Sequence, residues 1–169
     1  MTPMNWTLAL PEIVLACCAM GILIFGVLRR DDSTFVCTML SLGALALTAV
    51  LAVSTEYGTG YRGLFAVDGF AAFMKVLILV GAGLSAVLAL DYNEREGISR
   101  FEFPVLILLS TCGMMVMSSA TSLMTLYVGL ELQSLSLYVL CAFARDDVRS
   151  SESGIKFFVL GSLASGLLL

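Results

Sequence analysis

The sequence lacks histidine entirely, and charged residues make up only 13% of it. Its five cysteines lie inside apolar stretches, and none forms a CxxC pair. The histidine and clustered-cysteine patterns that hold zinc or haem are therefore missing. Isolated cysteines in apolar surroundings are typical of small buried side chains. We expect no redox metal and no bound cofactor on this chain.

Apolar residues make up 59% of the sequence, and the mean hydropathy is +0.99. Both values lie far above those of soluble globular domains. The formal net charge of −4 is spread over short polar segments and forms no basic face, which argues against a nucleic-acid partner. The composition indicates an integral membrane protein in contact with the lipid bilayer.

The apolar residues fall into six runs, each of which predicts a helix by its length and its polar flanks. The runs cover residues 7–28, 35–53, 70–90, 104–120, 122–143 and 154–169. No basic residue precedes the first run, so it is interpreted as a retained helix and not as a cleaved signal peptide. The last run is shorter than the ~20 residues that a span needs, so we expect this helix to be truncated. The predicted fold is all-α, with six transmembrane helices.

Arginine residues are distributed unequally between the loops that alternate along this arrangement. The first, third and fifth loops contain the arginines at 29, 30, 95, 100, 145 and 149, whereas the loops on the other side contain only Arg62. Basic residues near helix ends are retained in the cytoplasm. We therefore expect the loops at 29–34, 91–103 and 144–153 to be cytoplasmic and the amino terminus to lie on the opposite side.

Glu131 is the most informative residue, because it lies in the middle of a run, 122–143, that otherwise has no charge. An ionisable group at that depth is costly and is a functional candidate by default. Helical spacing places Tyr127, Ser134 and Tyr138 on the same face, where their hydroxyls would line a hydrated path for proton exchange. Alternatively, the tyrosines belong to interfacial belts and Ser134 to helix packing. This alternative leaves Glu131 unexplained, so we favour a functional stripe.

Two lysines lie within the predicted spans. Lys156 follows Glu152 by four residues, so a pair at the start of a helix explains it as well as a functional role does. Lys75 begins close to the outer surface, and Asp68 precedes it by two turns on the same face. Both interpretations stay open for each lysine.

Glu12 follows Pro11 at the outer end of the first run. Proline and a carboxylate are both favoured in the first turn of a helix. We therefore interpret Glu12 as a structural residue.

Several segments together resemble a known family. They are LYVGLELQSLSLYVLCAFARDDVRSSESGIK at 126–156 with the following FFVLGSLASGLLL, LPEIVLA at 10–16 and LFAVDGFAAFMKVLIL at 64–79. They resemble subunit N of the proton-pumping NADH:quinone oxidoreductase, respiratory complex I. The resemblance implies an antiporter-like bundle of about fourteen helices with two inverted repeats of about five helices each. Residues 1–103 would then form three amino-terminal helices, and residues 104–169 the incomplete start of the first repeat.

The resemblance also implies roles for individual residues. Glu131 matches the family's glutamate on the fifth helix, and Lys156 matches a lysine on the sixth. The family's principal partner lysine lies on the seventh helix, beyond Leu169. The implied mechanism is proton translocation coupled to quinone reduction. A glutamate and a lysine that approach each other favour the charged forms, and their separation favours the neutral forms.

The same resemblance implies the surroundings of the chain. It would be a multi-pass subunit in the bacterial cytoplasmic (inner) membrane, with a periplasmic amino terminus and other membrane subunits of complex I, including antiporter-like ones, as partners. NADH, FMN, iron–sulfur clusters and quinone would bind to other subunits. The alternatives are an antiporter-like subunit of another ion-translocating complex and a non-conducting scaffold. A scaffold should have a dry and fully paired Glu131.

Overall fold

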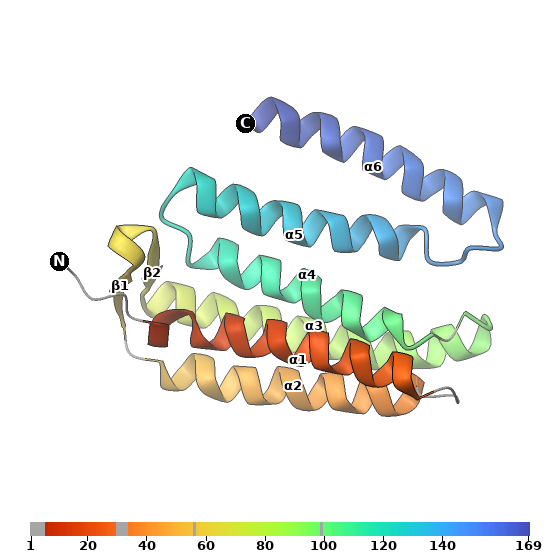
Figure 1. Cartoon of the computed structure of the whole chain (residues 1–169), viewed down its shortest axis with the longest axis horizontal. Helices are drawn as coiled ribbons and strands as arrows, with labels where there is room; N and C mark the ends of the chain where they lie inside the picture. Colours follow the sequence, from red (N-terminus) through yellow and green to blue (C-terminus); the bar gives the residue numbers. More distant parts are fainter. Residues whose placement is uncertain (1–5, 30–33, 56, 99) are drawn as a thin grey trace.

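The computed structural model describes residues 6–29, 34–55, 57–98 and 100–169. In this part of the chain, six α-helices account for most residues (Figure 1). They are α1 (Leu10–Leu28), α2 (Thr34–Ser54), α3 (Gly69–Arg95), α4 (Glu102–Ser118), α5 (Leu123–Cys141) and α6 (Val148–Leu168). A 3₁₀ helix, η1 (Trp6–Ala9), precedes α1. A small hairpin between α2 and α3 consists of β1 (Gly58–Gly60), the 3₁₀ turn η2 (Tyr61–Gly63) and β2 (Phe65–Val67).

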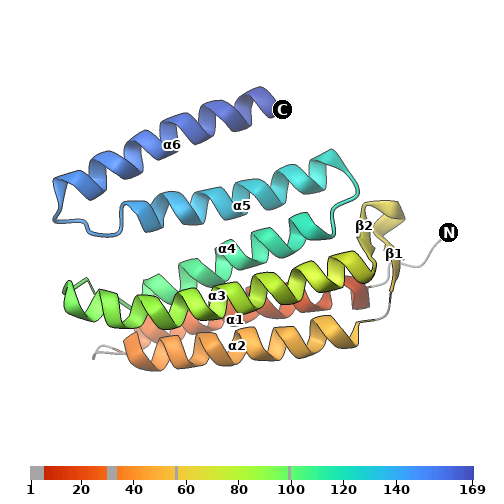
Figure 2. The same cartoon turned by 180° about the vertical axis from the view of Figure 1, so that it is seen from behind.

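The helices lie side by side and alternate in direction along the chain (Figures 1 and 2). Helices α1 to α4 form a four-helix bundle in which α1 packs against α2 and α4, and α3 against the same two helices. Helix α5 packs on α4, and α6 packs on the other side of α5. The helix ends that flank the loops predicted to share one side do lie at the same end of the bundle (Figures 1 and 2). Arg30 and the side chain of Arg62, which contributed to that prediction, lie outside the described residues.

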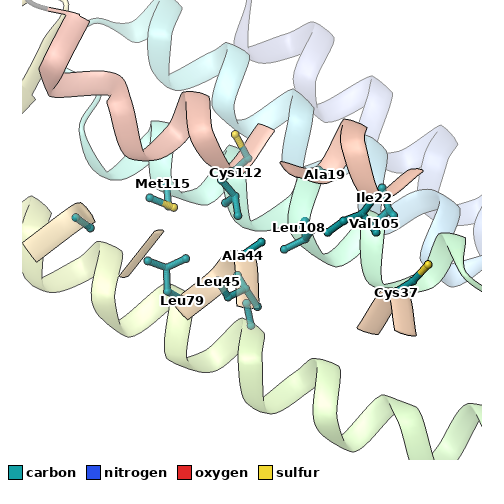
Figure 3. Packing of buried hydrophobic residues seen from close by; sticks show 13 residues of the cluster. Ala19, Ile22, Cys37, Ala44, Leu45, Leu79, Val105, Leu108, Cys112 and Met115 are labelled. Carbon is teal, nitrogen blue, oxygen red and sulfur yellow. The ribbon is translucent and has the colours of Figure 1, made fainter. Parts of the chain in front are cut away.

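The hydrophobic core lies inside the four-helix bundle (Figure 3). Leu15, Leu108 and Met115 are completely buried there. Large apolar side chains instead cover the outside of the helices, for example Val53, Leu88 and Leu163. This distribution fits a protein whose surroundings are lipid, because exposed apolar surface of this extent is not tolerated in water.

Four helices are long and apolar enough to cross a membrane: η1 with α1, α2, α3 and α5. Helix α4 is apolar but has only 17 residues, and α6 begins with a polar segment. The predicted all-α membrane fold with six helices in this chain is therefore confirmed in its helix content and order.

Two helices extend beyond their apolar runs. Helix α3 continues to Arg95, where an ion pair of 2.7 Å between Arg95 and Asp91 lies across its last turn. Helix α6 has 21 residues because it begins at Val148, after Asp147, whose carboxylate accepts a hydrogen bond from the Arg149 amide at 3.0 Å. Hydropathy detects only the apolar part of a helix, whereas capping and side-chain pairs also support polar turns.

The hairpin lies in a segment that hydropathy treats only as a loop. Its antiparallel register pairs Gly58 with Val67 and Gly60 with Phe65. The turn requires two residues with positive φ, Tyr61 at 52° and Gly63 at 85°. Strands of three residues are too short to show an alternating pattern, so the sequence did not predict them.

Candidate functional site

Helix α5 contains all four residues of the predicted polar stripe. Helix α5 begins after Ser122, whose side chain accepts a hydrogen bond from the Met124 amide at 3.3 Å. Tyr127, Glu131 and Ser134 are partly buried, and Tyr138 is buried. The stripe therefore lies on a side of the helix that is at least partly covered, where proteins retain polar groups in membranes.

The neighbouring helix α4 approaches α5 so closely that the two backbones touch. A Cβ atom on Gly113 would lie 2.6 Å from the Gln133 amide nitrogen and 2.7 Å from the Gly129 carbonyl oxygen. A Cβ atom on Gly129 would lie 2.9 Å from the Gly113 carbonyl oxygen. Both contacts are possible only without side chains, which is the usual role of small residues in membrane helix packing. Because Glu131 follows Gly129 by two residues, about 200° around the helix, it lies at the depth of this contact but on the side of α5 that faces away from α4.

On its other side, α5 meets α6 through Tyr138. The ring of Tyr138 makes edge-on contacts with Phe157 and Phe158, with centroids 5.0 and 5.6 Å apart. The Tyr138 hydroxyl lies against Gly161, where a Cβ atom would overlap it. Tyr138 is thus a packing residue between two helices as well as a member of the stripe.

Glu131 itself is incompletely satisfied. Its Oε1 atom is buried and has no hydrogen-bond partner among the residues that the structure describes. The contacts of Ala142 with Gly154 and of Tyr138 with Gly161 place Glu131 at the depth of residues 165–168 of α6, a segment without charged side chains. The titratable residues of α4 are Glu102 near its start and Cys112. In the described part of the chain, Glu131 thus has no counter-ion.

Lys156 lies at a different depth from Glu131. Its nearest carboxylate is Glu152, with 2.6 Å between Nζ and Oε1, and both side chains are largely exposed. The same contacts of α5 with α6 place Lys156 level with residues 140–143, which separates it from Glu131 by about 13 to 18 Å along the helix axis. The structure therefore forms the predicted pair with Glu152 and does not bring Lys156 to Glu131.

Lys75 is the largest fully buried side chain among the described residues, and its partner differs from the predicted one. Its ammonium lies 2.7 Å from Glu12 Oε1. Asp68, which sequence spacing suggested as the partner, instead accepts a hydrogen bond from the Ala71 amide at 2.7 Å and so caps α3. An N-cap carboxylate faces back along its own helix start, which directs it away from a residue two turns further on.

Glu12 was interpreted as a structural residue of the first turn, and it does lie in the first turn of α1. It is also buried, and this buried pair with Lys75 was missed by sequence reasoning. A signal was present: α1 and α3 run in the same direction, and both residues lie within the first two turns of their helices. Two opposite charges at one depth of a membrane bundle are candidates for a pair.

No group of three or more Cys, Asp or Glu side chains close enough to hold a metal ion occurs in the described segments. The buried hydroxyls of Ser41, Thr48 and Thr111 donate to carbonyl oxygens one turn back in their own helices. These hydroxyls need no further partner. Buried side-chain oxygens without a hydrogen-bond partner among the described residues occur instead in Glu12, Glu102, Ser119 and Glu131.

Fold and site together define a class: a multi-helix membrane protein with ionisable groups inside its helical bundle. The family model described as "NADH:quinone oxidoreductase/Mrp antiporter, TM" matches residues 120–169, which include α5 and α6. A chain of respiratory complex I from Thermus thermophilus with bound aureothin has the same fold, with a TM-score of 0.73 and 27% identity. That match covers 92% of this chain and 34% of the other.

Sequence relatives are more specific. NADH-quinone oxidoreductase subunit N of Granulibacter bethesdensis is 62% identical over 98% of this chain, and the match covers 35% of the relative. The same subunit of Rhodobacter capsulatus is 50% identical over 100% of this chain and 36% of the relative. The chain belongs to the subunit N family of NADH-quinone oxidoreductases. It spans about a third of the length of these relatives.

Proposed function

We propose that this chain is part of a membrane-arm subunit of an NADH:quinone oxidoreductase that translocates protons as quinone is reduced. The observation that carries the proposal is Glu131, whose buried Oε1 has no hydrogen-bond partner among the described residues. A carboxylate that serves only as a scaffold would be expected to have its partners in place. A carboxylate that exchanges protons must instead remain open to water or to a mobile partner.

Glu131 is the proposed proton carrier. Its charged form is favoured when a cation approaches, and its neutral form when that cation withdraws in a low-dielectric interior. Because α6 carries no charge at the depth of Glu131, the cation that acts on it has to come from another part of the assembled subunit. The partner lysines expected beyond Leu169 fit this requirement.

Lys156 on α6 and the other residues of the stripe on α5 have secondary roles in this proposal. Lys156 passes protons towards the inner end of α6. In the chain described here its ammonium is paired with Glu152. Tyr127 and Ser134 orient water beside Glu131, and Tyr138 joins α5 to α6 at the inner end of the stripe. In this role Lys156 is one of several relay groups and not the direct partner of Glu131.

The proposal also specifies the surroundings of the chain. The subunit lies in the bacterial inner membrane with its amino terminus on the periplasmic side, and its partners are other membrane subunits of the complex. Residues 1–103 form three amino-terminal helices, and residues 104–169 begin the first antiporter-like repeat. NADH, FMN, iron–sulfur clusters and quinone belong to other subunits, so this chain contributes translocation and not redox chemistry.

The test replaces Glu131→Gln in the complete subunit, within the assembled complex. Glutamine keeps the shape of the side chain but cannot ionise. We expect proton translocation and coupled quinone reduction, each divided by the amount of intact complex, to fall while assembly is retained. Glu94→Gln, at an exposed position near the end of α3, is the matched control and should behave like the natural protein. Unchanged translocation per intact complex in Glu131→Gln would refute the proposal.

A further inference from the structure

The buried Glu12–Lys75 pair lies across the diagonal of the four-helix bundle. Helices α1 and α3 each pack mainly against α2 and α4, so this ion pair links two helices that are not principal neighbours. The two side chains are only 6% and 1% exposed. Helix α4 contacts α1 at the same residue, because the Cys112 thiol donates a hydrogen bond to the backbone carbonyl oxygen of Glu12 at 3.7 Å.

Stability alone does not explain this pair. Burial removes both charges from water, and the attraction compensates for that loss only when the remaining hydrogen-bonding positions are also satisfied. Here the ammonium lies 2.7 Å from Glu12 Oε1, and Oε2 has no hydrogen-bond partner among the described residues. A buried ion pair is weak evidence for stability, which leads to the hypothesis that this pair specifies a position.

The position specified is that of the hairpin. The Lys75 ammonium lies 5.2 Å from the centroid of the Phe65 ring, within the range of a cation–π contact. Phe65 begins β2, which leads directly into α3 through Asp68. The Phe65 ring also packs edge-on against Tyr61, with centroids 6.1 Å apart. A displacement of Lys75 would therefore change the position of Phe65 and, with it, of the hairpin.

The hairpin in turn binds the connection between α4 and α5. The Ala66 amide donates to the Ser119 carbonyl oxygen at 2.9 Å, and Phe65 forms an antiparallel bridge with Ala120. The Thr121 amide donates to the Leu64 carbonyl oxygen at 3.3 Å, and the Thr121 hydroxyl donates to the carbonyl oxygen of Gly63. Helix α5 begins two residues later.

We propose that the Glu12–Lys75 pair is a positioning device that holds the outer end of α5, and through it Glu131, by way of the hairpin. Helix α5 is then held at two places, at its outer end by the hairpin and in its middle by the contact of Gly129 with Gly113. This inference rests on the proposed role of Glu131. It assigns a function to the first three helices, which contain no part of the polar stripe.

The test uses one variant in which no buried charge is altered. Thr121→Val removes the hydroxyl that contacts the hairpin and keeps the volume of the side chain. Thr55→Val is the matched control, because Thr55 directly follows α2 and its hydroxyl donates to the Leu51 carbonyl oxygen at the end of that helix. We expect Thr121→Val to lower proton translocation per intact complex and to change its pH profile, and Thr55→Val to leave both unchanged. Equal behaviour of the two variants would overturn the proposal.

A second set of variants tests the ion pair itself. Lys75→Met should lower translocation per intact complex and change its pH profile, and the charge-reversed Glu12→Lys with Lys75→Glu should restore part of both. In a Glu131→Gln background, Lys75→Met should have little further effect on the remaining quinone reduction, because residues that act through one group are not additive. A purely structural pair would instead change only the amount of intact complex. An undiminished effect in the Glu131→Gln background would show that Lys75 acts independently and would overturn the proposal.

The two proposals fail separately. If Glu131→Gln leaves translocation unchanged, the proposed function is wrong. If Glu131→Gln lowers translocation while Thr121→Val and the charge-reversed pair behave as structural changes only, the proposed function stands and the positioning role is wrong.

Discussion

Gly113→Ala should separate α4 from α5 at the depth of Glu131. The added Cβ would lie 2.6 Å from the Gln133 amide nitrogen, whereas ordinary contacts begin at 3.4 Å. The added Cβ would therefore lie 0.8 Å too close to α5 (2.6 Å against 3.4 Å). The obstructing atoms belong to the α5 backbone, which no rotamer change can move. Overpacking of this kind typically costs about 1–3 kcal/mol. We expect α5 to move outward and Glu131 to move with it.

The assay compares the intact complex by two measurements, its half-life at elevated temperature and its proton translocation per turnover. Kinetic stability is the suitable measure because large complexes unfold irreversibly. Gly81→Ala is the matched control, since Gly81 also lies in the middle of a membrane helix but has no atom within 4 Å of an added Cβ. Alanine favours helices over glycine by about 1 kcal/mol, so the control should be neutral or more stable. If Gly113→Ala matches Gly81→Ala in both measurements, the close contact does not position Glu131.

Three further predictions concern other parts of the chain. Lys156→Ala should lower translocation less than Glu131→Gln does, measured per intact complex; translocation equal to that of the natural protein would leave Lys156 as a surface partner of Glu152. With the native cysteines replaced, Glu96→Cys should resist and Thr59→Cys should accept an impermeant thiol reagent added outside sealed cells, and the reverse pattern would invert the topology. Lys75→Met alone should destabilise the subunit by about 3–5 kcal/mol because it leaves Glu12 buried without a counter-ion. Most of that loss should be recovered in the double variant Glu12→Leu with Lys75→Met, as judged from the amount of intact complex; no recovery would mean that packing and not charge dominates there.

The apolar runs predicted all six helices and their order, because a membrane helix requires a long stretch of uncharged residues and few sequences satisfy that by accident. The polar ends of α3 and α6 were not predicted, since local capping by residues such as Asp147 extends a helix beyond its apolar part. The hairpin was missed for a different reason. Its strands are held by contacts with η1 and with the connection after α4, both of which are far from the hairpin in the sequence.

The candidate site shows the same division between local and tertiary information. Glu131 and its stripe follow from helical periodicity alone, because residues three or four apart on one helix share a face in any fold. The partner of Lys75 does not, since Asp68 and Glu12 are both plausible by depth and charge. Capping of α3 occupies Asp68, and the diagonal of the bundle brings Glu12 to the ammonium.

The sequence by itself determined that this protein is a membrane protein, how many helices this chain contributes, and which carboxylate lies in the middle of one of them. Those properties depend on composition and on spacing along one helix. The tertiary structure alone decided that α4 touches α5 at two glycines, that Lys156 stays far from Glu131, and that Glu12 pairs with Lys75 beneath the hairpin. These properties depend on which helices are neighbours and at what depth. That is decided by packing between segments far apart in the chain, as between Gly63 and Thr121.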